Sequence, residues 1–92
     1  MKEIKLKFKN VITSLAGNSY GKTIFNEQVG DIDFQQSYNI IFPEQIINIA
    51  TSFIQGFFEE FVKEIGISGI EKQITITSSI ENLKSLIIDC LI

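Results

Sequence analysis

The chain has 92 residues, with 8 lysines, no arginine, 11 acidic residues and a formal net charge of −3. The acidic balance disfavours general nucleic-acid binding, and without arginine the chain also lacks the planar fork that recognises bases and phosphates. The absence of histidine removes the commonest general base and metal ligand, so we expect neither catalysis nor a bound metal or other cofactor.

The length suits one domain spanning residues 1–92 around a single core. Cys90 is the lone cysteine and cannot form an internal disulfide bond. A single thiol, together with an N-terminus that lacks the apolar stretch of a secretory leader, predicts a reducing compartment and a cytosolic protein. No apolar run approaches the ~18 residues of a membrane span, so we expect no membrane association.

The first predicted element is a strand over residues 2–9. Its lysines at positions 5, 7 and 9 alternate with apolar residues, which is typical of a strand with one solvent face. A local phosphate-binding patch is the alternative interpretation, but edge strands often carry lysine for protection. Val11 and Ile12 extend this strand or begin a short partner, and a loop follows over 14–19.

A short helix is predicted from Tyr20 to about Val29, ended by Gly30 in a left-handed conformation. The stretch "GNSYGKT" ahead of it ends like a nucleotide-binding P-loop, but only three residues separate its glycines where that loop has four. We therefore interpret Gly21 as a helix-entry glycine and Lys22 as solvated.

The next connection contains Asp31 and Asp33, which could converge on a hard cation, although two ligands are few for calcium. A polar turn is the alternative, since aspartate favours turns. The apolar stretch from Tyr38 to Phe42 then predicts a buried strand that stops at Pro43.

A strongly patterned helix is predicted to follow Thr51. Its apolar residues recur at helical spacing and form one buried stripe, which consists of Ile54, Phe57, Phe58, Phe61, Val62 and Ile65. Ser52 and Gln55 have the spacing of a capping box at the start of this helix. The alternative role for Ser52 is a phosphorylation site, because a phosphate at a helix start is favoured by the backbone N–H groups and the dipole.

The opposite face of this helix carries Gln55, Gly56 and Glu59. A glycine inside a helix lowers stability by about 1 kcal/mol relative to alanine, so a glycine at position 56 indicates a structural or functional role. Either it leaves a flat surface that a partner's backbone can approach, or it faces another element of the domain.

A turn over Gly66 to Gly69 is predicted next, followed by a strand in "KQITIT" and a last helix that opens at Ser78 with a capping box to Glu81. The apolar C-terminus "LIIDCLI" suits packing against a second copy, which would make a homodimer, or packing into the chain's own sheet. The alternation of strands and helices predicts an α/β fold, with a small mixed sheet of about four strands and two to three helices packed on it.

Two stretches resemble the STAS-like domains related to bacterial anti-sigma factor antagonists. "SLAGNSYGKTIFNEQV" is similar to the family's first helix and its approach, with Gly21 at the glycine, and "SFIQGFFEEFVKEIG" is similar to the central helix, with Ser52-Phe53 at its start. Ile41-Phe42 stands where the family commonly has Asp-Phe. The resemblance covers most of the chain and implies a STAS-like fold.

The resemblance also implies a regulatory protein-protein interaction module, with a kinase-like ATPase or an anti-sigma-type regulator as partner. Ser52, with its neighbour Thr51, matches the family's phosphorylated position, and the expected partner-binding surface consists of Thr51, Ser52, Gln55, Gly56 and Glu59. A rival hypothesis from the charge pattern is a small acidic inhibitor from a mobile element, which would block a host enzyme or a nucleic-acid-binding complex. A third hypothesis is a small enzyme or ligand-binding domain that uses the groove beside Ser52, and the absence of histidine argues against the enzyme.

Overall fold

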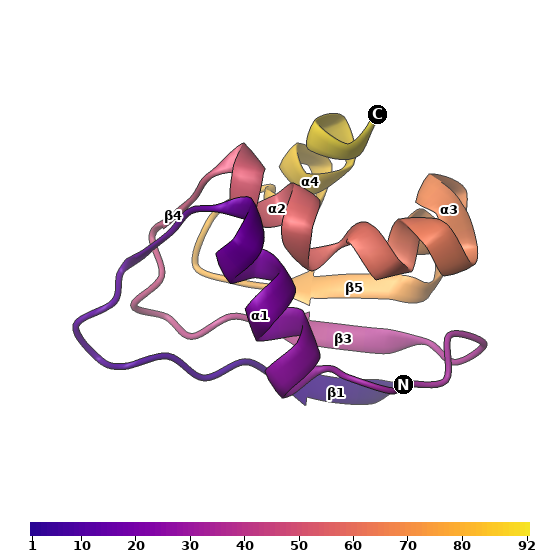
Figure 1. The fold of residues 1–92 in the computed structure, drawn as a ribbon, viewed down its shortest axis with the longest axis horizontal. Helices are drawn as coiled ribbons and strands as arrows, with labels where there is room; N and C mark the ends of the chain where they lie inside the picture. Colours follow the sequence, from indigo (N-terminus) through magenta and orange to yellow (C-terminus); the bar gives the residue numbers. More distant parts are fainter.

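Strands and helices alternate along the whole chain, as the sequence predicts. A computed structural model describes residues 1–92 (Figure 1). Its strands are β1 (Lys2–Lys5), β2 (Ser14–Leu15), β3 (Tyr38–Ile41), β4 (Asn48–Ile49) and β5 (Ile74–Thr77). Its helices are α1 (Asn18–Gln28), α2 (Thr51–Phe57), α3 (Glu59–Gln73) and α4 (Leu83–Leu91), so the α/β class is confirmed.

The strands form two separate sheets in which every pairing is parallel. The main sheet has the order β1-β3-β5, and β2 pairs only with β4. The predicted mixed sheet of about four strands is therefore wrong on two points: no strand pair is antiparallel, and the strands are divided between two sheets. A helical crossover follows β1 and another follows β3, and such crossovers return the chain to the end where the previous strand began, which gives parallel neighbours.

One face of the main sheet packs against the helices and the other faces solvent. On β3, the buried Tyr38 and Ile40 alternate with the half-buried Asn39 and Ile41. The open face carries polar residues on all three strands. Two of them are bonded to each other, since the hydroxyl of Thr77 donates a hydrogen bond of 3.0 Å to Oδ1 of Asn39. In Figure 1 the three strands lie side by side, with β1 at the edge farthest from α4.

Phenylalanine side chains from α2 and α3 make up the centre of the core. Phe53, Phe57, Phe58 and Phe61 are all fully buried, and the rings of Phe53 and Phe57 stack at 5.8 Å between centroids. The predicted stripe is confirmed for its first four members, while Val62 and Ile65 are only half-buried. Burial of each such side chain contributes very roughly 2 to 3 kcal/mol, so this cluster anchors the domain.

The predicted central helix is divided at Phe58 into α2 and α3. Phe58 departs from helical geometry between α2 and α3, but its N–H still donates to the carbonyl of Ile54 at 3.0 Å. The turn predicted over Gly66 to Gly69 is confirmed at its first residue: Gly66 has φ 69 and ψ 174, which breaks α3 into two helical segments. The second segment begins directly after Gly66 and runs to Gln73, so the turn is shorter than predicted. The buried Ile70 explains why this last part stays helical and folds back onto the core.

Three other boundaries differ from the prediction. The regular strand β1 ends at Lys5 rather than residue 9, and α1 begins at Asn18, inside the expected loop. The last helix begins at Leu83, not at Ser78. The capping box from Ser78 to Glu81 is absent, because the hydroxyl of Ser78 accepts the N–H of Ile80 in a turn instead.

The predicted end of the first helix is confirmed. Gly30 has φ 64, and its N–H donates to the carbonyl of Phe25 at 2.8 Å. A left-handed residue at this point lets the chain reverse and satisfies a carbonyl of the last turn.

A helix that crosses a bilayer needs roughly 20 mostly apolar residues, and none of the four helices combines that length with that apolarity.

Candidate functional site

Helices α1 and α2 pack closely because each presents a glycine to the other. A Cβ placed at Gly21 would lie 2.7 Å from the backbone nitrogen of Phe57, and one placed at Gly56 would overlap the carbonyl of Asn18. Both glycines are buried. Backbone therefore meets backbone at this crossing, and a side chain on either glycine would force the helices apart.

Ser52 contributes its hydroxyl to the same contact. Its Oγ accepts a hydrogen bond of 2.9 Å from the N–H of Gly17, the residue that precedes α1. Ser52 does not cap its own helix, so the predicted capping box with Gln55 is wrong. The N-cap lies two residues earlier, at Ala50, which has extended geometry and makes no side-chain capping bond. Pairing with β2 fixes that start, because the N–H of Ala50 donates to the carbonyl of Leu15 at 2.8 Å.

The structure separates the five predicted partner-binding residues into three environments. Thr51 and Gln55 are exposed, Ser52 and Glu59 are half-buried, and Gly56 is buried. Gly56 is therefore wrong as a surface residue, and the alternative that it faces another element of the domain is confirmed. The other four lie at or near the surface along one side of α2 and the first turn of α3.

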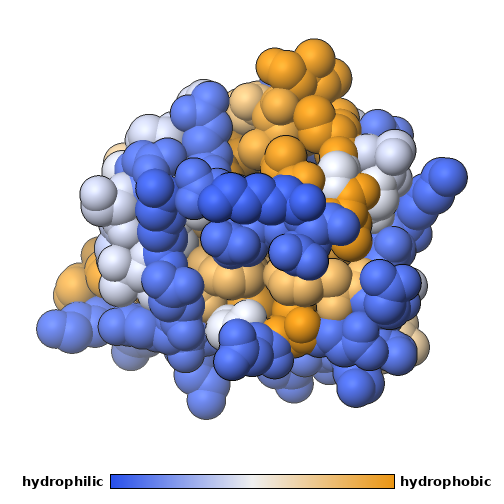
Figure 2. All heavy atoms as spheres, turned by 45° about the vertical axis from the view of Figure 1, so that its right-hand side comes forward, coloured by the Kyte–Doolittle hydropathy of each residue, from blue (hydrophilic) through white to orange (hydrophobic).

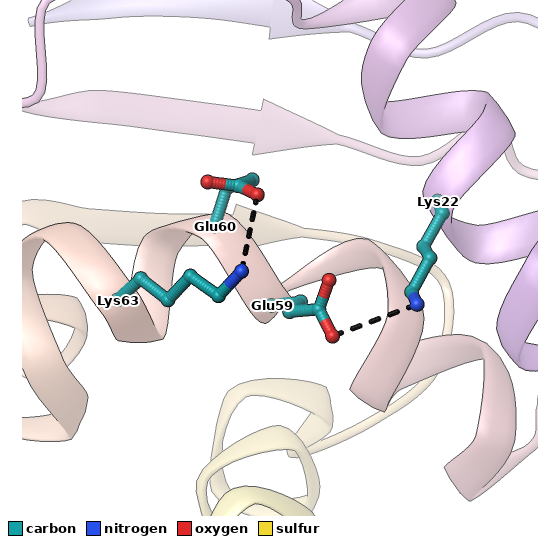
Figure 3. A network of polar contacts seen from close by, with 4 residues as sticks. All are labelled: Lys22, Glu59, Glu60 and Lys63. Carbon is teal, nitrogen blue, oxygen red and sulfur yellow. Dashed lines mark ion pairs between the residues drawn. The ribbon is translucent and has the colours of Figure 1, made fainter.

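Two ion pairs border this surface (Figure 3). The Nζ of Lys22 lies 3.6 Å from Glu59, which links α1 to α3, and the Nζ of Lys63 lies 3.7 Å from Glu60 within α3. Lys22 was expected to be solvated, and its side chain is 47% exposed. Exposed pairs of this kind contribute at most about 1 kcal/mol, so they matter more for the charge pattern of the surface than for stability.

On the other side of Thr51 lies an apolar groove between β4 and α4. The Oγ1 of Thr51 is 3.6 Å from Sγ of Cys90, which is half-buried. Ile47 and Leu86 are exposed at the rim of this groove, with fractional exposures of 62% and 49%. Figure 2 shows apolar side chains gathered toward the top of one face, at the height where α4 ends in Figure 1.

The C-terminal helix α4 buries only part of its apolar surface within the domain. Leu83 and Ile87 are buried in the core, whereas Leu86 and Ile92 are exposed. Packing into the chain's own core, the alternative to packing against a second copy, therefore accounts for one face of α4 only.

Asp31 and Asp33 are placed in a loop at the opposite end of α1. The carboxylate of Asp33 accepts the N–H of Gln35 at 2.9 Å, which is the turn predicted as the alternative to a cation site. No group of three or more metal-ligating side chains comes together in the chain. The two aspartates instead line a cleft of about 730 Å³, together with Glu60 and Glu64.

The helix contact at Gly21 and Gly56 was predicted only in part. The sequence left open that Gly56 faces another element of the domain, but it did not predict that Gly21, the fourth residue of α1, packs against α2. The stretch that resembles a P-loop is occupied by contacts within the domain. Lys22 points to Glu59, and the N–H of Gly17 is already bonded to Ser52.

Comparison of the chain with protein-family models, with curated proteins and with solved structures gave no match.

Proposed function

We propose that the chain is a regulatory protein-protein interaction domain with a STAS-like fold, which acts in the cytosol and performs no reaction of its own. Its partner is a kinase-like ATPase or an anti-sigma-type regulator. The observation that carries this proposal is the hydrogen bond from Gly17 to Ser52, which joins the starts of α1 and α2 beside the exposed Thr51 and Gln55.

Phosphorylation of Ser52 would act directly on that junction. A phosphate adds close to two negative charges and three acceptor oxygens to a hydroxyl that is now half-buried and only 2.9 Å from the nitrogen of Gly17. A phosphate is larger than the hydroxyl that it replaces, so in this proposal the segment before α1 moves and the surface around it changes. In this proposal, phosphorylation of Ser52 therefore changes the position of Gly17 and, through it, the first turn of α1.

Thr51 would respond differently, because its side chain is exposed and makes no bond to α1. A phosphate on Thr51 changes the charge of the binding surface without disturbing Gly17. The two neighbouring positions therefore predict distinct consequences: a conformational change for Ser52 and local repulsion for Thr51.

The experiment begins with the tagged protein purified from its native cell, where mass spectrometry identifies the bound partner and any phosphate on Ser52 or Thr51. Affinity for that partner is then measured for wild type, Ser52→Asp, Ser52→Ala and the control Ser85→Asp, which adds the same charge at an exposed position of α4. We expect Ser52→Asp to weaken binding about tenfold or more, which corresponds to about 1.4 kcal/mol, while Ser85→Asp binds as wild type does. Equal affinity of Ser52→Asp and wild type would refute the switch.

The cleft lined by Asp31, Asp33, Glu60 and Glu64 favours a second candidate, the small acidic inhibitor. Four carboxylates around one hollow present negative charge to a basic surface, as an inhibitor of a nucleic-acid-binding protein would. Binding of this kind weakens steeply with salt, since exposed charges are screened within about 8 Å at physiological ionic strength. Partner binding that is lost in Asp31→Asn/Glu64→Gln and unaffected in Ser52→Asp would favour this candidate.

A further inference from the structure

Strand β1 has backbone groups without a partner along its outer edge. The N–H of Lys2 donates to Ser37 at 3.2 Å and that of Leu6 to Ile41 at 2.9 Å, both toward the β3 side. Since N–H groups alternate between the two sides of a strand, those of Glu3 and Lys5 point away from β3. β1 is an edge strand (Figure 1), and Glu3 and Lys5 are exposed.

The same edge is closed just beyond the strand by the side chain of Gln28. Its Oε1 accepts the N–H of Lys7 and its Nε2 donates to the carbonyl of Lys7, both at 2.7 Å. The side-chain amide thus takes the place that the backbone of a neighbouring strand would occupy. The free part of the edge is therefore short and ends before Lys7.

We propose that β1 pairs with β1 of a second copy of this chain, antiparallel and about a two-fold axis at Ile4. The backbone N–H and C=O groups of Glu3 then bond to those of the partner's Lys5, and those of Lys5 bond to those of the partner's Glu3. This is possible because the N–H groups of Glu3 and Lys5 point outward in both copies. Ile4 faces the partner's Ile4 across the axis, and the two parallel sheets join into one.

Charge selects this register over its neighbours. Glu3 and Lys5 project from the same open face of the sheet. In the dimer, Glu3 of each copy lies directly opposite Lys5 of the other copy, and opposite charges at such positions stabilise an antiparallel pair. Sliding the pairing by two residues in one direction places Glu3 opposite the partner's Glu3. Sliding it in the other direction places Lys5 opposite the partner's Lys5 and brings Glu3 to Lys7, whose edge Gln28 occupies.

The paired edge is self-complementary, so the association closes at a dimer. A two-fold axis uses the free edge of both copies at once and leaves neither available for a third chain. An unpaired strand edge, such as that of β1, is a ready template for such pairing.

Sedimentation velocity over a dilution series tests the proposal. Wild type should show a monomer-dimer equilibrium, and Lys5→Pro should shift it at least tenfold toward monomer. Proline at this position removes an outward N–H and keeps the bonds to β3, so the far-UV circular dichroism should stay that of wild type. Wild type that remains monomeric at every concentration, or a dimer that survives in Lys5→Pro, would overturn the proposal.

Charge variants test the register itself. Glu3→Lys and Lys5→Glu should each be monomeric alone, because like charges then oppose each other, while an equimolar mixture of the two should dimerise again. Glu81→Lys, which makes the same charge change at an exposed site ahead of α4, should leave dimerisation unchanged. If the mixture stays monomeric, the register is wrong.

Amide hydrogen exchange of wild type gives a readout that needs no variant. Exchange at Glu3 and Lys5 should slow by at least tenfold as protein concentration rises through the dimerisation range, because these amides become bonded only in the dimer. Exchange at Lys2 and Leu6, bonded within the monomer, should change far less. Exchange at Glu3 and Lys5 that is independent of concentration would contradict the pairing.

Discussion

Ser52 and Gly17, 35 residues apart in the chain, are joined by a hydrogen bond of 2.9 Å from the backbone N–H of Gly17 to the Ser52 hydroxyl. The bond fixes the start of α1 against the start of α2, at the point where the chain leaves the small β2-β4 sheet. Any change at Ser52 therefore reaches the first turn of α1.

Ser52→Ala should destabilise the domain by about 1 to 2 kcal/mol, because it leaves the half-buried N–H of Gly17 without its acceptor. The free energy of unfolding from urea titration measures this loss. Thr51→Ala, the control one residue earlier, removes an exposed hydroxyl and should change stability by less than about 0.5 kcal/mol. Equal effects of the two variants would show that the bond to Gly17 contributes nothing.

Gly56→Ala should destabilise the domain by about 1 to 3 kcal/mol or more, because the new Cβ overlaps the backbone of Asn18. The sign of the change is diagnostic. An exposed helix glycine gains about 1 kcal/mol on replacement by alanine, so a surface position would show stabilisation instead.

Gly21→Ala tests the same contact from the other helix and should also destabilise, since its Cβ would lie 2.7 Å from the nitrogen of Phe57. Gln55→Ala provides the control on the exposed side of α2 and should be close to neutral. Thermal unfolding monitored by circular dichroism is sufficient to rank the stabilities of Gly21→Ala, Gly56→Ala and Gln55→Ala. A stabilised Gly21→Ala would contradict the close crossing of α1 and α2.

The contrast between Gly56 and Ser52 shows what the sequence could and could not supply. The alternation of strands and helices, the phenylalanine stripe and the helix end at Gly30 are local patterns, and each is confirmed. The two capping boxes are local patterns as well, yet Ser52 bonds to Gly17 and Ser78 to Ile80. The bond of Ser78 is a local turn that competes with the cap, whereas tertiary packing brings Gly17 to Ser52, and a partner 35 residues away has no local signature.

The pairing of the strands has no local signature either. Composition predicts which residues form strands, but not which strands are neighbours. The separation of Ser14–Leu15 and Asn48–Ile49 into their own sheet depends on contacts between distant segments. The helical segment after Gly66 likewise depends on Ile70 packing in the core, so the turn signal of the two nearby glycines is realised at Gly66 alone.

Gly66→Ala should cost about 1 to 3 kcal/mol for a reason that differs from the one at Gly56. There is open space where its Cβ would go, but φ 69 with ψ 174 lies in a region that only glycine adopts readily. The loss should be similar for Gly66→Ala and Gly66→Ser, because strain in the backbone does not depend on side-chain size. Urea unfolding of both variants checks this expectation. A much larger loss for the serine variant would indicate a steric clash rather than backbone strain.

Gln28→Met should lower the free energy of unfolding by about 1 to 2 kcal/mol, because it keeps the length of the side chain and removes both bonds to the Lys7 backbone. It should also expose two more backbone groups on the outer edge of the chain beyond β1. If β1 pairs with a second copy, this longer edge should strengthen dimerisation while the monomer is weakened. Urea unfolding at low protein concentration and sedimentation at high concentration separate the two effects. Glu27→Gln, a change of similar size at the preceding exposed position, should alter neither measurement. Weaker dimerisation in Gln28→Met than in wild type would show that Gln28 supports the pairing rather than limiting it.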